Sequence, residues 1–556
     1  MTPPQTTPPH APTPEPFRWG RAEQAQALHD FQDPRRTNPS QRRHAHQAGL
    51  PRSTLQHWLR RQQRAALDPH AAAFFDSPAG LAFLHRLLVA AHLVFNLQGS
   101  AGLRLLSLFL RLCQLDRVVA ASYGPRQQFA ARLEQAVLDF AAQQRQQLAR
   151  DMAPRPIALA EDETFHPQVC LVACEPVSGF LLLEQYAAGR DQATWDAAVH
   201  QALAGLPVTV ALQVGDEAKG LLAHAREGLG VPHSPDLFHV QHEASRATAP
   251  ALAAQTRRLR GCQEHARQRL GQARAERDAA AGQPRGPGRP IDHERRVREA
   301  EATVACADRW LAACQGRQEQ ARAAIRGLGE ADHPFDLETG QSQDAATVER
   351  RLCASFERLQ ALGGEVSLPE SGRARLAKAR RVLPGLVAAV AFFWVRVRAA
   401  SQGRYGEGSW VWVERLLAGM YLRRVAGQAR GAERRGVLRA VAEQCLREAR
   451  AVAAEPPGGW EEAERQAREW SGWFQRSSSC VEGRNGQLAL RHHSLHRLSA
   501  RRLGALTALH NYWLRRPDGT TAAERFFGSK PADLFEWLLA RLPLPARPAR
   551  QRQQAA

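Results

Sequence analysis

The spacing of apolar and polar residues changes twice along the chain, which predicts a helical N-terminal part, a short stretch of strands and a long helical part. Between residues 69 and 152 apolar residues recur at helical spacing. Three helices are expected there, in the segments LAFLHRLLVAAHLVF, LRLLSLFLRLCQL and FAARLEQAVLDFAAQQRQQLAR. The first two are apolar almost all round and are therefore expected to be buried.

At Pro154 the pattern changes to short β-prone runs. Five strands are expected in PIALAEDE, QVCLVACEP, GFLLLEQYAAG, PVTVALQVGD and DLFHVQHE, and two helices in DQATWDAAVHQALAGL and EAKGLLAHAREGLG. A Pro/Ser/Gly turn at 176–179 suits a hairpin between the second and third strands. The resulting order, β-β-β-α-β-α-β, places Asp162 at the end of the first strand and Asp216 at the end of the fourth.

From about residue 245 to residue 470 the helical pattern returns, without strand patterns. Two long charged helices joined by the breaker GQPRGPGRP predict an antiparallel helical hairpin. The PGRP tract within the breaker resembles half of an AT-hook, and a Pro/Gly turn explains it as well. We expect this part to form an all-helical domain outside the sheet that serves DNA contact or subunit pairing.

Two short basic helices are predicted near the N-terminus. Asn38 and Pro39 supply an N-cap and an N1 proline for the first, Gly49 ends it, and the second runs from Arg52 to about residue 64. The stretch RRHAHQAGLPRSTLQHWLRR resembles the helix-turn-helix of bacterial regulators and transposases, whose second helix enters the major groove. The resemblance implies that these side chains face DNA: Arg52, Ser53, Gln56, His57 and Arg60. An ordinary helical hairpin with a solvated basic face is the alternative.

The charge balance favours a polyanionic partner. The 556 residues include 75 Lys+Arg against 55 Asp+Glu, a formal net charge of +20 that points to nucleic acid. All the cations except Lys219, Lys378 and Lys530 are Arg, which suits bidentate phosphate contacts and equally fits a GC-rich coding sequence.

The remaining composition bears on location. Nine cysteines without a C-x-x-C pair indicate neither a zinc ribbon nor a disulfide framework, so a reducing cytoplasm is expected. The Pro/Thr-rich N-terminus has no apolar h-region and is expected to be a disordered tail. The longest uncharged apolar run, VLPGLVAAVAFFWV, is too short to span a membrane, so no membrane partner is expected.

Carboxylates at the ends of two strands of one sheet, together with a third on a helix, can converge on a pair of divalent cations. In such a site one ion lowers the pKa of an attacking water or 3′-hydroxyl, and the other stabilises the leaving oxygen. Hard cations such as Mg²⁺ or Mn²⁺ prefer carboxylates to His or Cys. The arrangement suits phosphodiester chemistry, and Asp162 and Asp216 meet its first requirement.

Asp162, Asp216 and Glu482, separated by 54 and 266 residues, are arranged like the acidic triad of DDE-type insertion-sequence transposases, which have an RNase H-like fold. The segment SSCVEGRNGQL resembles the family's third-acid motif, and GTTAAERFFG resembles a segment near the end of such transposases. The long second gap is similar to that of members with a helical insertion. The resemblance covers the helix-turn-helix, 154–245 and 471–530, and implies that the three acids are catalytic and bind two Mg²⁺ or Mn²⁺ ions.

The same resemblance implies that the partner is double-stranded DNA, both at the element ends and at the target. It also implies a homo-oligomer in the DNA complex and a cytoplasmic protein associated with the nucleoid. In some of these transposases a basic residue follows the Glu by seven positions. Here that position is Ala489, and the nearest cations, Arg484 and Arg491, are expected to contact DNA.

Each acid also has a plainer interpretation. Asp162 lies in the run EDE, so the carboxylate that faces the site depends on the strand register. Asp216 suits an N-cap, and Glu482 suits the first turn of a helix. Glu524 in GTTAAERFFG competes with Glu482 for the third position.

Histidines occur near two of these segments. His239 and His242 in DLFHVQHE are expected at a strand end near the active site, since a zinc site would need a further ligand pair. A second group either borders DNA or forms a solvated helix face: Arg491, His492, His493, His496 and Arg497.

We therefore expect an α+β transposase that hydrolyses phosphodiesters and transfers strands at insertion-sequence ends. The alternatives are a catalytically inactive transposase-derived DNA-binding protein and an RNase H-like nuclease that does not transpose. The expected segments are a disordered tail (1–20), a helix-turn-helix unit (21–66), a helical region (67–153), an RNase H-like catalytic core in two parts (154–245 and 471–530), a helical insertion (246–470) and a C-terminal helix with a basic tail (531–556).

Overall fold

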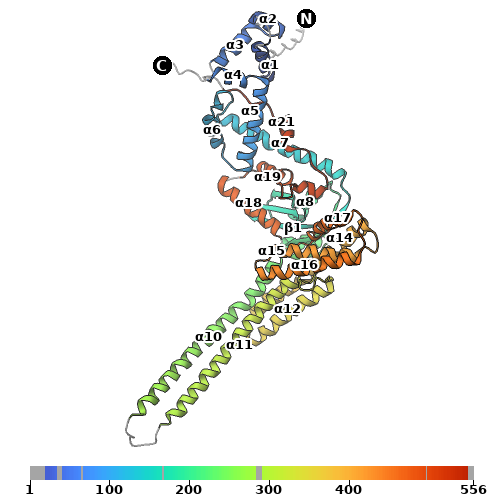
Figure 1. Cartoon of the computed structure of the whole chain (residues 1–556). Helices are drawn as coiled ribbons and strands as arrows, with labels where there is room; N and C mark the ends of the chain where they lie inside the picture. The colour runs from blue at the N-terminus through green and yellow to red at the C-terminus, as the bar shows by residue number, and fades with distance from the viewer. Residues whose placement is uncertain are drawn as a thin grey trace, which may run out of the picture. The chain divides into compact units, whose positions relative to one another are not determined.

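A computed structural model divides the chain into two compact units (Figure 1). One unit comprises Met1–Asp151 and Ala489–Ala556, and the other comprises Met152–Leu488. The structure describes residues 19–33, 35, 40–63, 67–165, 168–282, 291–476, 478–495 and 498–548. The expected second part of the catalytic core, 471–530, is therefore split, because the boundary between the units falls within helix α18 (Ser479–Leu495).

The second unit holds a mixed five-stranded sheet in the order β3-β2-β1-β4-β5. Its strands are β1 (Arg155–Phe165), β2 (Val169–Glu175), β3 (Phe180–Tyr186), β4 (Val208–Gly215) and β5 (His233–Pro235). Strands β1 to β3 pair antiparallel, whereas β1 with β4 and β4 with β5 pair parallel. Helix α8 (Gln192–Leu203) joins β3 to β4, and α9 (Lys219–Ala223) with the π-helix η3 (His224–Leu229) joins β4 to β5. The predicted order β-β-β-α-β-α-β is confirmed.

The predicted location of the fifth strand was wrong. The segment DLFHVQHE begins helix α10 (Leu237–Ala280), and the strand is the tripeptide that precedes it. Asp236 caps the helix, because its carboxylate accepts a hydrogen bond from the Phe238 backbone N–H at 2.7 Å. Leu237, Val240 and Ala244 are buried at helical spacing. Over so short a segment, the apparent alternation of apolar and polar residues was mistaken for a strand.

The sheet register assigns the acidic residues of β1 to opposite faces. Asp162 pairs with Val172 of β2, which pairs in turn with Glu184 of β3. Side chains that are directly opposite on paired strands point to the same face, so these three form one row. Glu161 is one residue away and therefore points to the other face. The register therefore determines the face of the sheet on which each carboxylate lies.

In the ranges that the structure describes, 236–282 and 291–476, the segment between β5 and α18 consists of helices joined by turns and loops, with an isolated bridge between Phe335 and Ser342. Its helices are α10, α11 (His293–Ala331), α12 (Ala345–Glu365), α13 (Glu370–Arg381), α14 (Leu383–Tyr405), α15 (Trp410–Gln428), α16 (Ala432–Val452) and α17 (Gly459–Ser471). The insertion packs into the same compact unit as the sheet.

Helices α10 and α11 lie side by side as the predicted antiparallel hairpin (Figure 1). Polar bridges run across it from Gln263 to Asp308 at 2.6 Å and from Arg274 to Glu301 at 2.7 Å. The residue number rises on one helix as it falls on the other, which fixes the antiparallel direction. The PGRP tract of the breaker lies outside the described residues.

The first unit is made of helices in the described part of the chain. They are α1 (Arg21–Gln32), α2 (Gln41–Gln47), α3 (Arg52–Gln63), α4 (Pro69–Phe75), α5 (Pro78–Ala91), the π-helix η1 (His92–Gln98), α6 (Leu103–Leu112), the 3₁₀ turn η2 (Leu115–Arg117), α7 (Tyr123–Arg150), α19 (Ala500–Tyr512), α20 (Ala522–Phe527) and α21 (Leu534–Arg541). The expectation that the second apolar segment is buried was wrong in part. Leu105, Leu108 and Leu112 of α6 are exposed, since this helix buries only one side, through Leu106 and Leu110.

Helices α2 and α3 pack against each other and against α1. Ser40 caps α2, and its Oγ accepts the Arg43 N–H at 3.3 Å, whereas the expected cap Asn38 lies outside the described residues. Gly49 ends the helix with a φ of 66°, a left-handed conformation that glycine adopts without strain. The shared core comprises Ala27, Leu28, Ala45, Leu50, Leu55 and Trp58.

Two helical stretches are long and apolar enough to cross a membrane, Pro78–Gln98 and Glu370–Tyr405. In their most apolar windows, 61% and 44% of the residues are buried inside the protein. Length and composition do not separate a membrane span from the core helix of a soluble protein.

The packing of α3 predicts that shortening one of its buried side chains lowers the stability of the fold. Leu55 is fully buried, so Leu55→Ala should lower the free energy of unfolding by about 2 to 5 kcal/mol through lost contacts and a residual cavity. The exposed Gln63→Ala on the same helix is the control. Urea unfolding and hydrogen exchange of residues 41–63 measure the effect, and equal behaviour of the two variants would contradict the packing.

Candidate active site

Two aspartates lie side by side in the register, beyond the last parallel pair of the sheet. Strands β1 and β4 pair in parallel up to Glu161 and Gly215, and the next residues are Asp162 and Asp216. Both aspartates are half-buried. The Asp216 carboxylate accepts the Ala218 N–H at 3.0 Å in the turn before α9, but it is not the N-cap of that helix, which is Ala218.

The proximity of the two aspartates changes the acidity of Asp162. Burial raises the pKa of Asp162 to about 6, from 3.8, with a further increase from the negative charge of Asp216. Hydrogen bonds from the Glu163 N–H and from Asn485 oppose the shift. The carboxyl group is therefore close to its ionisation point near neutral pH, a property that favours an active-site role over a purely structural one.

Helix α18 covers the face of the sheet that carries Asp162. Its buried side chains, Val481, Arg484 and Leu488, recur at helical spacing. The Arg484 guanidinium donates two hydrogen bonds of 2.6 Å to the two oxygens of Glu184, and both side chains are almost completely buried. This bidentate pair joins α18 to the far strand of the row that contains Asp162.

Asn485 brings α18 to the candidate site. Its Nδ2 donates a hydrogen bond of 2.7 Å to Asp162 Oδ2. Its Oδ1 is buried and has no hydrogen-bond partner among the described residues. A buried carbonyl oxygen without a donor, beside a carboxylate pair, fits a hard cation as the missing partner.

Glu482 lies one turn before Asn485 on α18, and its side chain is exposed. Its carboxylate lies 3.5 Å from the Ser478 hydroxyl. Within the described ranges, no group of three His, Cys, Asp or Glu side chains is placed to hold a metal ion. The structure therefore brings Asp162 and Asp216 together, with Asn485, and leaves the Glu482 carboxylate outside the group.

The donor set fits one hard divalent cation. Asp162 and Asp216 supply carboxylate oxygens, and Asn485 supplies an amide oxygen, which are the ligand types that Mg²⁺ and Mn²⁺ prefer. A second ion would require the carboxylate of Glu482 as well.

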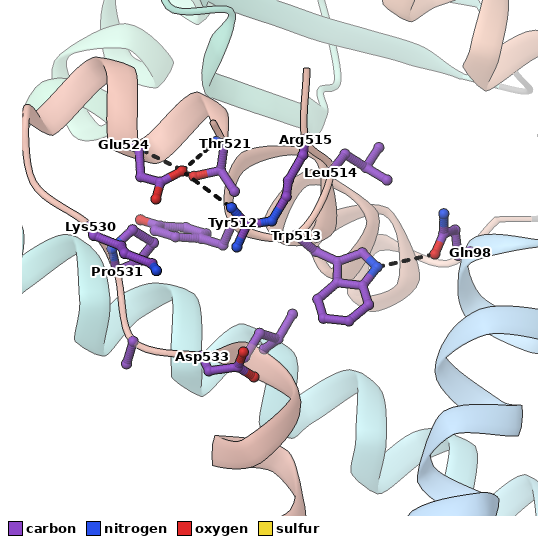
Figure 2. A pocket seen from close by; sticks show the side chains of 12 residues that line it. Gln98, Tyr512, Trp513, Leu514, Arg515, Thr521, Glu524, Lys530, Pro531 and Asp533 are labelled. Carbon is purple, nitrogen blue, oxygen red and sulfur yellow. Dashed lines mark hydrogen bonds and ion pairs between the residues drawn. The ribbon is translucent and has the colours of Figure 1, made fainter. Parts of the chain in front are cut away.

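Glu524, the competitor for the third acidic position, has a structural role (Figure 2). It accepts the Thr521 N–H at 2.6 Å in the capping box that begins α20, and it lies 3.8 Å from an Arg515 nitrogen. The pocket that it lines with Tyr512 and Trp513 belongs to the first unit, whereas the two aspartates belong to the second. The capping contacts explain this glutamate without catalysis.

The two arginines of α18 that were expected to contact DNA are both engaged inside the protein. Arg484 forms the buried pair with Glu184, so its expected phosphate contact is replaced by a structural contact. Arg491, in the first unit, donates to the carbonyl oxygens of Leu97 and Gln98 at 3.1 and 2.8 Å. His496 and Arg497 of the same basic stretch lie outside the described residues.

The expected recognition residues are accessible on α3. Arg52, Ser53, His57 and Arg60 are exposed, and Gln56 is half-buried. Leu55 and Trp58 point into the core, so the charged side of α3 is the side left for a partner.

His239 and His242 are exposed on the first turns of α10, and not at a strand end. The His242 ring stacks on Phe238, with ring centroids 5.9 Å apart. Phe238 is itself 66% exposed. Asp236, the cap of α10, also accepts the Ser478 N–H at 3.0 Å, so this aromatic surface adjoins the start of α18.

Sequence reasoning missed Glu184 and Asn485 as parts of the site. Glu184 ends the apolar run FLLLE on a buried strand, and a charge in that position signals a buried partner. Asn485 lies within the segment compared with the third-acid motif, three residues after Glu482, which puts both on one side of the helix.

Comparison with known proteins yields one match. Residues 413–554 match the model of a family of unknown function, DUF6399. No curated protein and no solved structure matches the chain. The match includes all of α18, and hence Glu482 and Asn485, but neither Asp162 nor Asp216.

The buried pair predicts a large and non-additive stability effect. Arg484→Met or Glu184→Leu alone should destabilise the second unit by about 3 to 5 kcal/mol, because each leaves an uncompensated buried charge. The double variant should recover most of the loss, since apolar side chains of similar volume replace both charges. Urea unfolding gives the coupling energy, and additive losses in the double variant would contradict the assignment.

The raised pKa of Asp162 predicts how stability depends on pH without divalent cations. The folded state keeps the proton up to about pH 6, whereas the unfolded carboxyl loses it near 3.8, so stability should fall as the pH rises between these values. In Asp162→Asn no carboxyl group ionises at this position, so its free energy of unfolding at pH 7 should exceed that of wild type. The expected difference is about 1 to 2 kcal/mol, because solvent screens the partly exposed side chain. Urea unfolding in EDTA at about pH 4 and pH 7 tests it. The same difference at both pH values would contradict the assignment.

Proposed function

We propose that the protein is a DDE-type DNA transposase whose catalytic edge is formed by Asp162, Asp216 and α18. The observation that carries the proposal is the pair of aspartates that follow the last parallel pair of the neighbouring strands β1 and β4, faced by a helix that carries Asn485 and Glu482. A mixed sheet of three antiparallel and two parallel strands, followed by a helical insertion, supports an RNase H-like core.

Asp162, Asp216 and the Asn485 carbonyl would hold a Mg²⁺ or Mn²⁺ ion. When bound, such an ion acidifies a water or 3′-hydroxyl and stabilises the charge that develops on a phosphodiester. The chain itself positions the ligands, because β1 and β4 fix the two carboxylates and the Arg484–Glu184 pair fixes α18 over them. Glu482, exposed on the same helix, is the carboxylate available to complete a second ion site when DNA is present.

Two accessible surfaces support contact with DNA. The charged side of α3 offers Arg52, His57 and Arg60, with a net charge of +20 on the whole chain. In the second unit, Phe238 and the neighbouring histidines form an exposed aromatic surface close to the start of α18. A surface of this kind suits stacking against an unpaired base beside the scissile phosphate.

A second candidate function is DNA binding without cleavage. The exposed position of Glu482 favours it, because three carboxylates are not assembled in the described part of the chain. The candidates differ in whether Glu482 turns toward the aspartates when metal and DNA bind.

The catalytic proposal predicts which changes abolish cleavage. Asp162→Asn, Asp216→Asn and Glu482→Gln should each abolish metal-dependent nicking of a labelled substrate that carries the DNA ends flanking the gene, because each removes an anionic ligand. Glu217→Gln is the control, since this carboxylate pairs with Lys378 at 2.8 Å. Gel-shift binding should be unchanged in all four variants. Normal nicking by Glu482→Gln would reject that residue, and no nicking by the unmutated protein would favour the binding-only function.

The helix α3 predicts sequence-specific recognition. Arg52→Ala with Gln56→Ala should weaken binding to the end sequence by about 1 to 3 kcal/mol per lost base contact and affect unrelated DNA less. Gln63→Ala on the same helix should leave both unchanged. Gel shifts on the two DNAs measure the difference, and an equal loss on both would assign the helix to phosphate contacts alone.

A further inference from the structure

A second polar cluster lies on the opposite face of the sheet from Asp162. Glu161 is completely buried there. Its Oε2 accepts a hydrogen bond from Gln213 Nε2 at 2.9 Å, and its Oε1 lies 3.2 Å from His224 Nε2, at ion-pair distance but without hydrogen-bond geometry. The carboxylate next to the proposed catalytic aspartate is therefore held by an amide on β4 and an imidazole on η3.

The imidazole of His224 is placed between two carboxylates. Its Nδ1 lies 2.5 Å from Asp196 Oδ1, on the side opposite Glu161. A neutral imidazole has a single N–H, so it would direct a lone pair at one of these oxygens. Only the imidazolium turns an N–H and a positive charge toward both carboxylates.

Two further titratable side chains border the hollow beside His224. His200 of α8 and Glu227 of η3 line the same surface hollow, of about 650 Å³, as His224 and Asp196. The Trp195 ring stacks on the imidazole with an interplanar angle of 27°. Burial lowers the pKa of His224, but Glu161 and Asp196 together outweigh burial and leave the pKa raised.

The local backbone is shaped to admit the Asp196 carboxylate. His224 begins a π-helical turn, and π-helical turns are frequent at functional sites. A Cβ atom at Gly228 would lie 1.9 Å from Asp196 Oδ1, so only glycine fits while the carboxylate keeps its place. The π-helix and the glycine together bring Asp196 against the imidazole.

We propose that His224 is a positioning residue of the proposed active site: its imidazolium, held by Asp196, binds Glu161 and fixes β1 with Asp162 facing Asp216 and Asn485. Without that cation, Glu161 is a buried anion beside two further carboxylates, and β1 shifts to relieve it. The catalytic consequence rests on the proposed function, whereas the charge state of His224 does not.

The charge state is tested by NMR on the full chain with ring-¹⁵N histidine. The signals of His224 are identified by their loss in His224→Gln. Both ring nitrogens should show N–H character through neutral pH, above the ordinary imidazole pKa of about 6.5. Titration of His224 at or below that value would overturn the inference.

The positioning role is tested by Mn²⁺ affinity, read from electron paramagnetic resonance without DNA. His224→Gln and Asp196→Asn should each weaken Mn²⁺ binding about 10- to 100-fold, as expected for residues that orient ligands. Glu217→Gln should bind as wild type. Thermal unfolding confirms that each variant folds, and Asp196→Asn keeps the imidazole in place should His224→Gln be too unstable.

The outcomes separate the two proposals. Wild-type Mn²⁺ affinity in both folded variants would overturn the positioning role and leave the proposed function standing. Mn²⁺ binding that weakens as expected, with no nicking by the unmutated protein, would reject the transposase and keep His224 as a positioning residue of a metal site.

Discussion

The buried pair between Arg484 and Glu184 is the contact on which the rest of the proposed site depends. It lies in the same row of the sheet as Asp162, two strands away, which is roughly 10 Å at the usual strand spacing. Two charges taken out of water are held only by good geometry, and here both oxygens of the carboxylate are matched by guanidinium nitrogens. The pair therefore fixes the rotation of α18, and with it the direction in which Asn485 points.

The three consecutive acids of β1 show how one strand serves two tasks. Asp162 faces α18 and the second aspartate, whereas Glu161 faces His224 and Gln213 on the other side. A shift of one residue in register would exchange these tasks and bury the wrong carboxylate on each face. Because Glu161 and Asp162 are adjacent carboxylates on opposite faces of β1, the proposal places a cation on each face: the His224 imidazolium beside Glu161 and a divalent ion beside Asp162.

Much of the fold could be predicted from the sequence, because the change from helical spacing to short apolar runs marks the sheet clearly. The four main strands, the hairpin turn and the long helical hairpin follow from that pattern. The fifth strand could not, because a three-residue strand has no periodicity and Asp236 acts as a helix cap. Asp216 follows the end of β4 as predicted, whereas Asp162 lies within β1, which continues to Phe165 in its pairing with β2. The two aspartates still lie side by side, because β1 and β4 are parallel neighbours. The ion pair of Arg484 and the contact of His224 with Glu161 were not predicted, because each joins residues far apart in the sequence.

The central claim is that Asp162, Asp216 and Asn485 form the ligand set of a divalent cation. A crystal structure of the full chain soaked in Mn²⁺, with anomalous scattering recorded, locates the ion directly. We predict an anomalous peak within coordination distance of the Asp162 and Asp216 carboxylates and of the Asn485 carbonyl oxygen, the ligand types that hard cations prefer. A Mn²⁺ peak elsewhere on the chain, or none at these residues, would contradict the account.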